Sequence, residues 1–242
     1  MQQTTESIPS ISLVVPFYNE QAVLAGTIER CLALREQCGE ELELLFVNDG
    51  SGDSSPGIAA SYVPRITLVS YPENRGKGYA VRAGVAASTG DIVVTTDADL
   101  AYGTDALLQA VARLREEKAD LLCGSRRLDE SGYSGYPGLR KLASGVFSGY
   151  VKLMLRIPVS DTQCGLKAFR GDVGRDLFAA CTVDRFAYDL ELLGLAAHRG
   201  LRFCEMPATV LTHGDSKVSI LRDSISMALE VLRIRRRLRR AK

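Results

Sequence analysis

Residues 91–99 read Asp-Ile-Val-Val-Thr-Thr-Asp-Ala-Asp, a short apolar run of β-type residues that ends directly in two carboxylates. Similar apolar runs lie at residues 11–16, 42–47, 66–69 and 119–123. Between the runs, residues 20–37, 52–61, 76–88 and 103–117 have helical spacing or good helix-forming residues. Because near-continuous apolar strands need both faces buried, this alternation is typical of parallel strands covered by helices. We therefore predict an α/β fold built on a doubly wound, mostly parallel sheet.

Length and composition place the chain among folded globular domains. It has 242 residues, of which 46% are hydrophobic and 24% are charged. This balance excludes disordered, collagen-like and small disulfide-rich proteins. No linker or internal repeat divides the sequence, so we expect one domain over residues 1–242. The six cysteines form no Cys-x-x-Cys pair, and we expect reduced thiols rather than a metal centre.

The two acids that follow the 91–96 run predict a metal site. Asp97 and Asp99 are two residues apart, and in an extended segment two such side chains share a face. Hard oxygen ligands select Mg²⁺ or Mn²⁺, and such ions complete their coordination with substrate phosphates. Asp-x-Asp by itself is common on surface loops, but directly after an apolar strand it favours a diphosphate ligand.

The other predicted strands also end in polar motifs, at the edge where ligands of doubly wound sheets bind. Pro16-Phe17-Tyr18-Asn19-Glu20 and Asn48-Asp49-Gly50-Ser51 follow the first two runs, and we expect Asp49 to point into the binding region. Asn74-Arg75-Gly76-Lys77-Gly78 opens a predicted helix, whose N-terminus and two cations suit an anion or a nucleotide. The spacing matches neither a Walker A loop nor a dinucleotide fingerprint, which argues against phosphate-driven hydrolysis and hydride transfer.

Two further segments complete the pattern, Gly124-Ser125-Arg126 and Asp161-Thr162-Gln163-Cys164-Gly165-Leu166-Lys167-Ala168-Phe169. With the motifs above, in this order, the sequence resembles glycosyltransferase family 2, and within it the polyprenyl (dolichyl) phosphate mannosyl- and glucosyltransferases. The resemblance covers about residues 9–218, and these last two segments are its most specific part. It implies a GT-A fold and the inverting transfer of a hexose, glucose or mannose, from UDP-glucose or GDP-mannose to polyprenyl phosphate.

The resemblance also implies roles for individual residues. The residues that would hold the nucleotide-sugar are Pro16, Tyr18, Glu20, Asp49, Lys77 and Asp97. Asp97 and Asp99 would hold the metal ion, Mg²⁺ or Mn²⁺. Because it holds this ion, Asp99 is also predicted to be a catalytic residue. The residues that would hold the acceptor phosphate are Arg126, Arg140, Ser144, Ser216 and Lys217. Arginine suits this task because its planar guanidinium group can bind two phosphate oxygens at once. The alternative for Arg140 is a helix residue that extends its charged group into solvent.

A third carboxylate matches the acceptor side of the family. Asp189, in the segment Arg185-Phe186-Ala187-Tyr188-Asp189-Leu190-Glu191-Leu192, is by that analogy the catalytic base. A phosphate monoester, with a second pKa of about 6, is largely ionised at neutral pH and needs little deprotonation. Positioning of the sugar or the acceptor is therefore an alternative role for Asp189, whereas a hydroxyl acceptor demands a true base. If the segment is extended rather than helical, Glu191 is the better placed of the two acids.

At one position the sequence departs from the mannosyl branch of the family. Where many dolichyl phosphate mannose synthases carry a further metal-shell Gln after Asp-Ala-Asp-Leu, this chain has Ala101. The difference favours the glucosyl relatives, which also lack that Gln. Two other functions stay open at this point. One is transfer to a soluble or polysaccharide hydroxyl, and the other is a nucleotide-sugar-binding module without turnover.

The charge distribution predicts an anionic membrane surface as a further partner. Residues 231–242 hold seven of the 30 basic residues and no acid, whereas residues 1–230 carry 23 basic and 29 acidic residues, a net charge of −6. Amphipathic helices expected at 139–157 and 218–242 can lie on an anionic bilayer, where each basic residue contributes about 1 kcal/mol. A solvated charge run is the alternative. The acidic body, and a tail without interleaved aromatic residues, argue against a nucleic-acid partner.

The membrane contact is expected to be peripheral. No apolar run in the sequence reaches the roughly 18 residues that a spanning helix needs, and the N-terminus lacks a basic segment followed by an apolar one. We expect a cytoplasmic protein that lies on the cytoplasmic face of a membrane. We also expect that deletion of residues 231–242 releases it from anionic liposomes and leaves nucleotide binding intact.

Overall fold

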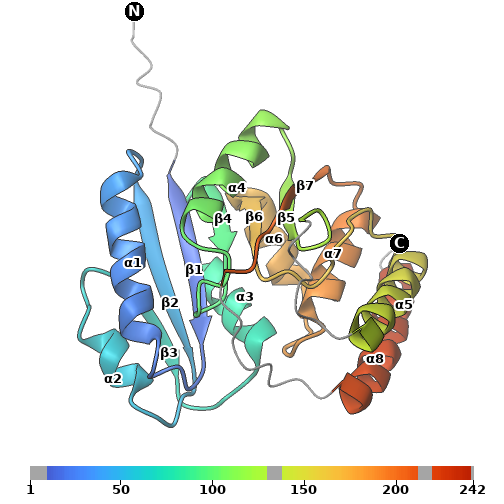
Figure 1. The fold of residues 1–242 in the computed structure, drawn as a ribbon, viewed down its shortest axis with the longest axis horizontal. Coiled ribbons are helices and arrows are strands. Elements are labelled where there is room, and N and C mark those ends of the chain that lie inside the picture. The colour runs from blue at the N-terminus through green and yellow to red at the C-terminus, as the bar shows by residue number, and fades with distance from the viewer. Residues whose placement is uncertain (1–9, 130–137, 212–219, 241–242) are drawn as a thin grey trace, which may run out of the picture.

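The computed structural model describes residues 10–129, 138–211 and 220–240, which form a seven-stranded sheet with helices on both faces (Figure 1). The strands are β1 Ile11–Phe17, β2 Leu42–Asp49, β3 Thr67–Tyr71, β4 Ile92–Thr95, β5 Leu121–Ser125, β6 Lys167–Arg170 and β7 Phe203–Pro207. The helices are α1 Leu24–Gln37, α2 Ser55–Ala60, α3 Lys77–Ala87, α4 Asp105–Glu116, α5 Gly138–Leu155, α6 Gly171–Ala180, α7 Tyr188–His198 and α8 Ile220–Arg240. All the predicted strands and helices are present, whereas β6, β7, α6 and α7 are not among the elements predicted from the spacing.

The strand order confirms a doubly wound, mostly parallel sheet. It runs β3-β2-β1-β4-β6-β5-β7, and every pairing is parallel except those of β6. The order reverses between β1 and β4, and in such sheets ligands bind beyond the carboxyl ends of the strands at that point. Because β6 runs antiparallel to β4 and β5, it begins at the edge where they end. Residues 161–166, just before β6, therefore lie at the edge where ligands bind.

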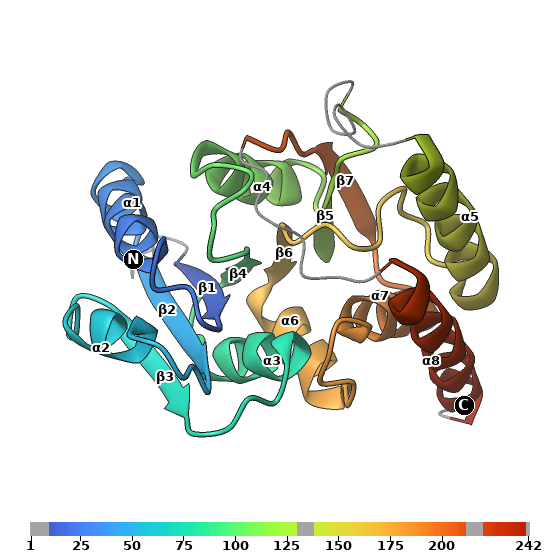
Figure 2. The same cartoon turned by 60° about the horizontal axis from the view of Figure 1, so that its bottom comes forward.

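The central strands are buried on both faces, which explains their continuous apolar runs. In β1, Leu13 and Val15 pack in the core beneath α1, α2 and α4, whereas Val14 packs in the core on the side of α3, α6 and α7. Because side chains alternate between the two faces of a strand, a strand covered on both sides needs apolar residues at successive positions. Figure 2 shows α5 and α8 side by side, outside α7.

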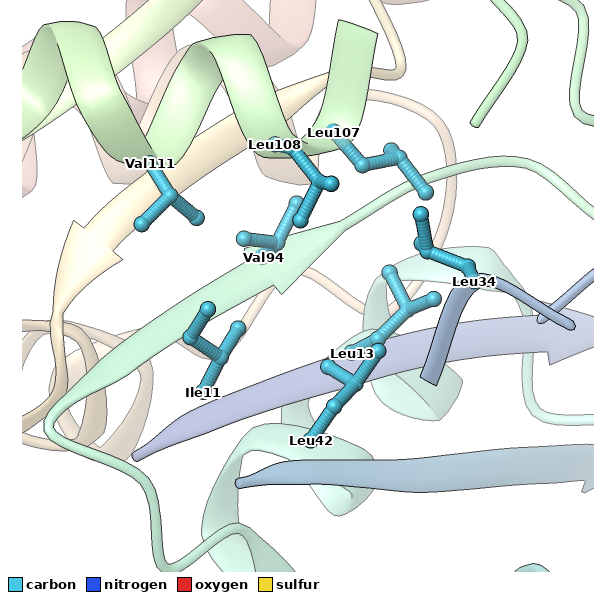
Figure 3. A pocket seen from close by; sticks show the side chains of 8 residues that line it. All are labelled: Ile11, Leu13, Leu34, Leu42, Val94, Leu107, Leu108 and Val111. Carbon is cyan, nitrogen blue, oxygen red and sulfur yellow. The ribbon is translucent and has the colours of Figure 1, made fainter. Parts of the chain in front are cut away.

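A small apolar cavity of about 10 Å³ lies in the core on the side of α1 and α4. The residues that line it are Ile11, Leu13, Leu34, Leu42, Val94, Leu107, Leu108 and Val111 (Figure 3). Ile11 and Leu42 are the first residues of β1 and β2, so the cavity reaches the end of the sheet opposite to the predicted site. A hole of this size with an apolar lining stays dry, and it is a packing defect rather than a ligand site.

The C-terminal helix α8 is part of the packed core and not a detached tail. Val231 and Ile234 are 0% and 2% exposed, and Leu238 packs against the same cluster as they do. Deletion of residues 231–242 would remove these buried side chains and uncover the core on the side of α7. The expectation that such a deletion leaves nucleotide binding intact is therefore not supported.

Candidate active site

Asp97 and Asp99 follow β4 in a tight turn. The Leu100 N–H donates a hydrogen bond to the Asp97 carbonyl at 3.0 Å, and Leu100 has a φ of 47°. This turn corrects the extended geometry expected from the sequence. The two carboxylates are half-buried and interact, since burial and then the charge of Asp97 raise the pKa of Asp99 above its ordinary value.

The two carboxylates fit a divalent cation. One oxygen of Asp99 accepts a hydrogen bond from the Ala101 N–H at 3.1 Å, and among the described residues its other oxygen has no donor. Two carboxylates whose charges repel each other are stabilised by a cation between them, and oxygen ligands suit Mg²⁺ or Mn²⁺. In the part of the chain that the structure describes, no cluster of three His, Cys, Asp or Glu side chains is able to hold a metal. Asp97 and Asp99 are thus the candidate ligands within the described residues, and substrate phosphates or water can complete the coordination of such an ion.

Lys77, the first residue of α3, forms an ion pair with Asp97. Burial acts to raise the pKa of Asp97, but the charges of Lys77, Lys167 and Arg126 outweigh it and hold that pKa below its ordinary value. Burial likewise acts to lower the pKa of Lys77, and the charges of Asp97 and Asp189 outweigh it. The prediction that residues 74–78 open a helix with a cation at its N-terminus is confirmed. That cation lies beside the acids of the candidate metal site.

The turn before β6 braces Asp97 from the other side. A Cβ on Gly165 would lie 2.1 Å from a carboxylate oxygen of Asp97, so only glycine leaves room for the acid. The Nζ of Lys167 donates a hydrogen bond to the Cys164 carbonyl at 2.6 Å and closes the turn. The segment 164–167 thus shapes the surroundings of Asp97 in two ways. Gly165 has no side chain to crowd the carboxylate, and Lys167 supplies a buried positive charge.

Asp189, in the first turn of α7, forms a buried ion pair with Lys167. The Lys167 Nζ lies 2.6 Å from the carboxylate, and the two side chains are 1% and 8% exposed. Burial acts to lower the pKa of Lys167, but the charge of Asp189 outweighs it and raises that pKa. The Asp189 carboxylate is thus engaged by a buried ammonium group. The geometry therefore favours a positioning role for Asp189 over that of a general base.

Glu191 lies in a helix, and its side chain bonds to the loop before that helix. Because residues 188–198 form α7, the condition that favoured Glu191 over Asp189, an extended segment, is not met. The Glu191 side chain accepts hydrogen bonds from the N–H groups of Thr182 and Val183 at 2.8 and 2.7 Å. It also pairs with an arginine of α8. Its oxygens are therefore used in holding the loop before α7.

Asp49, at the end of β2, organises the loop that leads into α3. Its side chain is 3% exposed, which corrects the expectation that it points into an open binding region. The carboxylate accepts hydrogen bonds from the N–H groups of Arg75 and Gly76 and from the Tyr71 hydroxyl, each at 2.9 Å. Asp49 thus shapes the loop that ends at Lys77. Its predicted contact with a nucleoside stays a prediction.

The residues after β1 lie at the same edge. Pro16 is a buried residue of β1, and Tyr18, just beyond the strand, is 42% exposed. The Glu20 N–H donates to the Ser55 hydroxyl at 2.9 Å, which ties this segment to the one that follows β2. The structure thus brings Tyr18 and Glu20 to the side of the sheet that carries Asp49, as predicted, and leaves the Tyr18 ring accessible to a ligand.

Arg126, just after β5, is held by Asp161. Its Nε and Nη2 donate to the two carboxylate oxygens at 2.7 and 3.0 Å. Burial acts to lower the pKa of Arg126, but the hydrogen bonds and charge of Asp161 outweigh it and raise that pKa. Among the described residues, no acceptor bonds to Nη1 of Arg126. This nitrogen therefore stays available to donate hydrogen bonds to an anion, as predicted for a residue that binds phosphate.

The structure does not describe the side chains of the other residues that were predicted to bind the phosphate. Arg140 and Ser144 belong to α5, but their side chains lie outside the described residues, as do Ser216 and Lys217 entirely. Their roles stay predictions.

Sequence reasoning gave no role to Asp161 or Lys167, the two residues that hold Arg126 and Asp189. A signal was present for Lys167, because it lies between the apolar residues Leu166 and Ala168 in a segment that becomes a buried strand. A lysine in such a position needs a carboxylate partner, since burial of an unpaired charge is costly. The identity of that partner is not readable from the sequence.

Comparison with known proteins agrees with this geometry. The family model described as Glycosyl transferase family 2 matches residues 12–178. A dolichyl-phosphate beta-glucosyltransferase of Trichomonas vaginalis is 32% identical over 236 residues, which cover 92% of this chain and 70% of the relative. The dolichyl-phosphate beta-glucosyltransferase of Drosophila melanogaster is 33% identical over 219 residues, which cover 83% of this chain and 67% of that relative.

A solved structure shares the fold. Glucosyl-3-phosphoglycerate synthase from Mycobacterium tuberculosis, in complex with Mn²⁺ and UDP-glucose, superposes with a TM-score of 0.67 at 21% identity, over 93% of this chain and 77% of that one. The seven-stranded sheet, with its antiparallel β6 beside β4, is thus the GT-A fold of nucleotide-sugar enzymes. From the motif order, the placement of the acids after β4 and the match over residues 12–178, the chain belongs to glycosyl transferase family 2 and is a glycosyltransferase.

Proposed function

We propose that this enzyme transfers glucose from UDP-glucose to a polyprenyl phosphate of the dolichyl type, with inversion at the anomeric carbon. One geometric observation carries the proposal. Asp97 and Asp99 lie together at the carboxyl edge of the sheet, within the electrostatic reach of Lys77 and Arg126. A pair of acids for a cation, flanked by cations for phosphates, suits a reaction between a sugar diphosphate and a phosphate acceptor.

The choice of sugar rests on the relatives and on one residue. The relatives from Trichomonas vaginalis and Drosophila melanogaster are named for glucosyl transfer to dolichyl phosphate. Ala101 stands where many mannosyl relatives carry a metal-shell Gln, which also favours glucose over the mannose of GDP-mannose. The neighbouring crystal structure holds UDP-glucose with Mn²⁺ in the same fold.

The proposed reaction forms one bond as it breaks another. An oxygen of the acceptor phosphate attacks C1 of glucose, the bond from C1 to the diphosphate oxygen breaks, and the diphosphate leaves with the bonding electrons. Lys77, next to Asp97, stabilises the negative charge that builds up on the leaving group. Arg126, fixed by Asp161, holds the acceptor phosphate. A Mg²⁺ or Mn²⁺ ion bound by Asp97 and Asp99 supplies further neutralisation of the diphosphate.

No general base is required in this scheme. The acceptor phosphate has a second pKa of about 6 and is largely ionised at neutral pH. Asp189 then acts through Lys167, because it holds the charge of Lys167 in a place from which it lowers the pKa of Asp97. Asp189 is in this proposal a positioning residue.

We propose further that α5 and α8 form a surface for an anionic membrane. Leu229, Leu232 and Arg233 lie on one side of α8, opposite to the buried Val231 and Ile234, because α-helical residues three and four apart share a face. Leu153 of the adjacent α5 is 72% exposed. Exposed leucines beside arginines suit the interface of an anionic bilayer. Among the described helices, none is both long and apolar enough to cross a bilayer.

A position on the cytoplasmic face of that membrane is also part of the proposal. All six cysteines are free thiols, and Cys38 and Cys204 are only partly buried. Unpaired and accessible thiols suit a reducing compartment.

A donor panel tests the proposed reaction. The purified chain is incubated with radiolabelled UDP-glucose or GDP-mannose, dolichyl phosphate and either Mg²⁺ or Mn²⁺. We expect label from UDP-glucose in the organic phase, and none with Asp99→Ala. Label that enters the organic phase only from GDP-mannose would overturn the choice of sugar. Label that moves only to a water-soluble acceptor would overturn the lipid acceptor.

A further inference from the structure

The loop between α6 and α7 connects the C-terminal helix to the donor side of the site. On one side, Glu191 accepts hydrogen bonds from the N–H groups of Thr182 and Val183 at 2.8 and 2.7 Å. Glu191 is 3% exposed, and its charge is balanced by Arg237 of α8, which also bonds to the Thr182 hydroxyl. The first half of the loop is thus fixed by a carboxylate that is itself held by α8.

On its other side the loop supports the beginning of α3. The Asp184 carbonyl accepts a hydrogen bond from the Tyr79 N–H at 3.0 Å, and the Asp184 carboxylate pairs with Arg82. The contact is so close that a Cβ on Gly76 would lie 2.6 Å from the Asp184 carbonyl oxygen. A Cβ on Gly78 would lie 2.6 Å from the Val183 carbonyl oxygen. Loop and helix therefore come into close backbone contact at these two glycines.

The same end of α3 carries Lys77, which pairs with Asp97. A displacement of the loop at 182–184 therefore moves the N-terminal turn of α3, and with it the cation that faces the candidate metal site. Packed backbone transmits such a displacement because close-packed interiors have little space to absorb it.

Apolar contacts and the ion pair of Arg237 with Glu191 both anchor helix α8 at this point. Val231 and Ile234 bury its inner side, and Arg237 is the arginine of α8 that reaches a buried carboxylate. Loss of the Arg237 charge leaves Glu191 buried without its counter-charge, which favours movement of Glu191 toward water. The two N–H groups of the loop then lose their acceptor.

We infer that Arg237 and Glu191 are positioning residues that couple the docking of α8 to the donor-binding end of α3. The inference rests on the proposed donor site, and it adds that the affinity for a nucleoside diphosphate depends on a residue of the C-terminal helix. The pair acts through residues 182–184 and touches no substrate itself.

Two measurements on lipid-free protein test this coupling. In the first, amide hydrogen exchange is followed without ligand in Arg237→Gln and in Arg199→Gln. Arg199 also pairs with a carboxylate, that of Asp176, but it does so at the surface at the far end of α7. We expect faster exchange at the amides of Val183 and Tyr79 in Arg237→Gln, and wild-type exchange there in the control. Equal exchange in both variants would overturn the inference whatever the substrate is.

In the second measurement, UDP affinity with Mn²⁺ and donor kinetics are compared. We expect Arg237→Gln to weaken UDP binding and raise the donor KM by about threefold or more, with kcat changed less, and Arg237→Lys to restore part of the loss. We expect Arg82→Gln to weaken UDP binding too. The double variant Arg237→Gln with Arg82→Gln should lose less binding free energy than the sum of the two single losses, because both changes act through one loop. Additive effects, or an unchanged KM in Arg237→Gln, would refute the coupling. A wild-type protein that binds neither UDP nor GDP would instead refute the proposed donor.

Discussion

The Nζ of Lys167 and the carboxylate of Asp189 are 2.6 Å apart, and both side chains are almost fully buried. Lys167 comes from the strand β6 and Asp189 from the helix α7, so the pair joins the sheet to the layer that covers it. The charge of Lys167 also lowers the pKa of Asp97. The charge of a buried ion pair thus reaches one of the acids to which the metal ion and diphosphate are assigned.

Removal of either partner of this pair should destabilise the fold. We expect Lys167→Met or Asp189→Asn to cost about 3–5 kcal/mol in urea unfolding, because each leaves a buried charge or polar group without its partner. The double variant Lys167→Met with Asp189→Leu should cost less than the sum of the two single changes. Asp172→Asn, which breaks the exposed pair with Arg170, serves as the control and should cost under about 1 kcal/mol. Equal costs for Asp189→Asn and Asp172→Asn would contradict the importance of the buried pair.

The pH dependence of metal binding should report on Asp99. Burial and the charge of Asp97 raise its pKa above the usual 3.8, so a proton competes with the cation at a higher pH than at an ordinary aspartate. We expect Mn²⁺ affinity to be full above that raised pKa and to fall as the pH is lowered through it. In Asp97→Asn the repulsion is removed, and NMR titration of the metal-free protein should give a lower pKa for Asp99. An unchanged Asp99 pKa in that variant would show that the two carboxylates do not interact.

Gly165→Ala should impair the site more than the fold. The added Cβ would lie 2.1 Å from an oxygen of Asp97, so the carboxylate has to leave its present position beside Lys77 in the candidate metal site. We expect a loss of transferase activity of tenfold or more, with the far-ultraviolet spectrum retained. Gly57→Ala is the matched control, because no atom lies within 4 Å of its added Cβ and alanine favours the helix α2. Equal activity in the two variants would argue against close packing at Asp97.

The exposed leucines of α8 offer a test of the membrane surface that leaves the core in place. We expect the double variant Leu229→Ser and Leu232→Ser to sediment less with anionic liposomes, because the apolar contact with the bilayer interface is lost. UDP binding in solution should stay at the wild-type level, since neither side chain is buried. Deletion of residues 231–242 should instead lower the melting temperature, because it removes Val231 and Ile234 from the core. Unchanged sedimentation of the double variant would contradict the proposed surface.

The small cavity on the side of α1 and α4 should accept one more methylene. Val111 lines it from α4, and Val111→Ile adds one carbon to a side chain that is 3% exposed. We expect a gain of about 0.5–1 kcal/mol in the free energy of unfolding, with transferase activity unchanged. A loss of stability would mean that the cavity is too narrow for the added atom and that the core is overpacked.

Many residues of the candidate site could be predicted from the sequence, because they directly follow the predicted strands. Asp97, Asp99 and Tyr18 follow apolar runs, and parallel strands deliver their following residues to one edge of the sheet. The start of α3 at Lys77 was readable as well, from glycines and cations ahead of a helical pattern. These sequence patterns do not show which residue pairs with each charged side chain. Asp49, for example, accepts hydrogen bonds from the loop before α3, and its predicted contact with a nucleoside stays a prediction.

The antiparallel strand β6 shows why the rest was not predictable. Its four residues are too few for a periodic pattern to give their direction, and the direction is what brings Gly165 against Asp97 and Lys167 against Asp189. The carboxylates of Asp161 and Glu191 are paired with arginines that lie 35 and 46 positions away in the chain. Sequence spacing does not encode such distances.

The sequence by itself determined the layers of this protein, because the apolar periods of strands and helices are local properties that each segment carries with it. It also determined which acids stand at the edge of the sheet, since residues that directly follow a strand go where the strand ends. Only the tertiary structure decided which of those acids stay partly exposed and which are neutralised inside the protein. That choice depends on cations brought in by other elements, and the energy of a charge in a protein is set by the neighbours that replace its water.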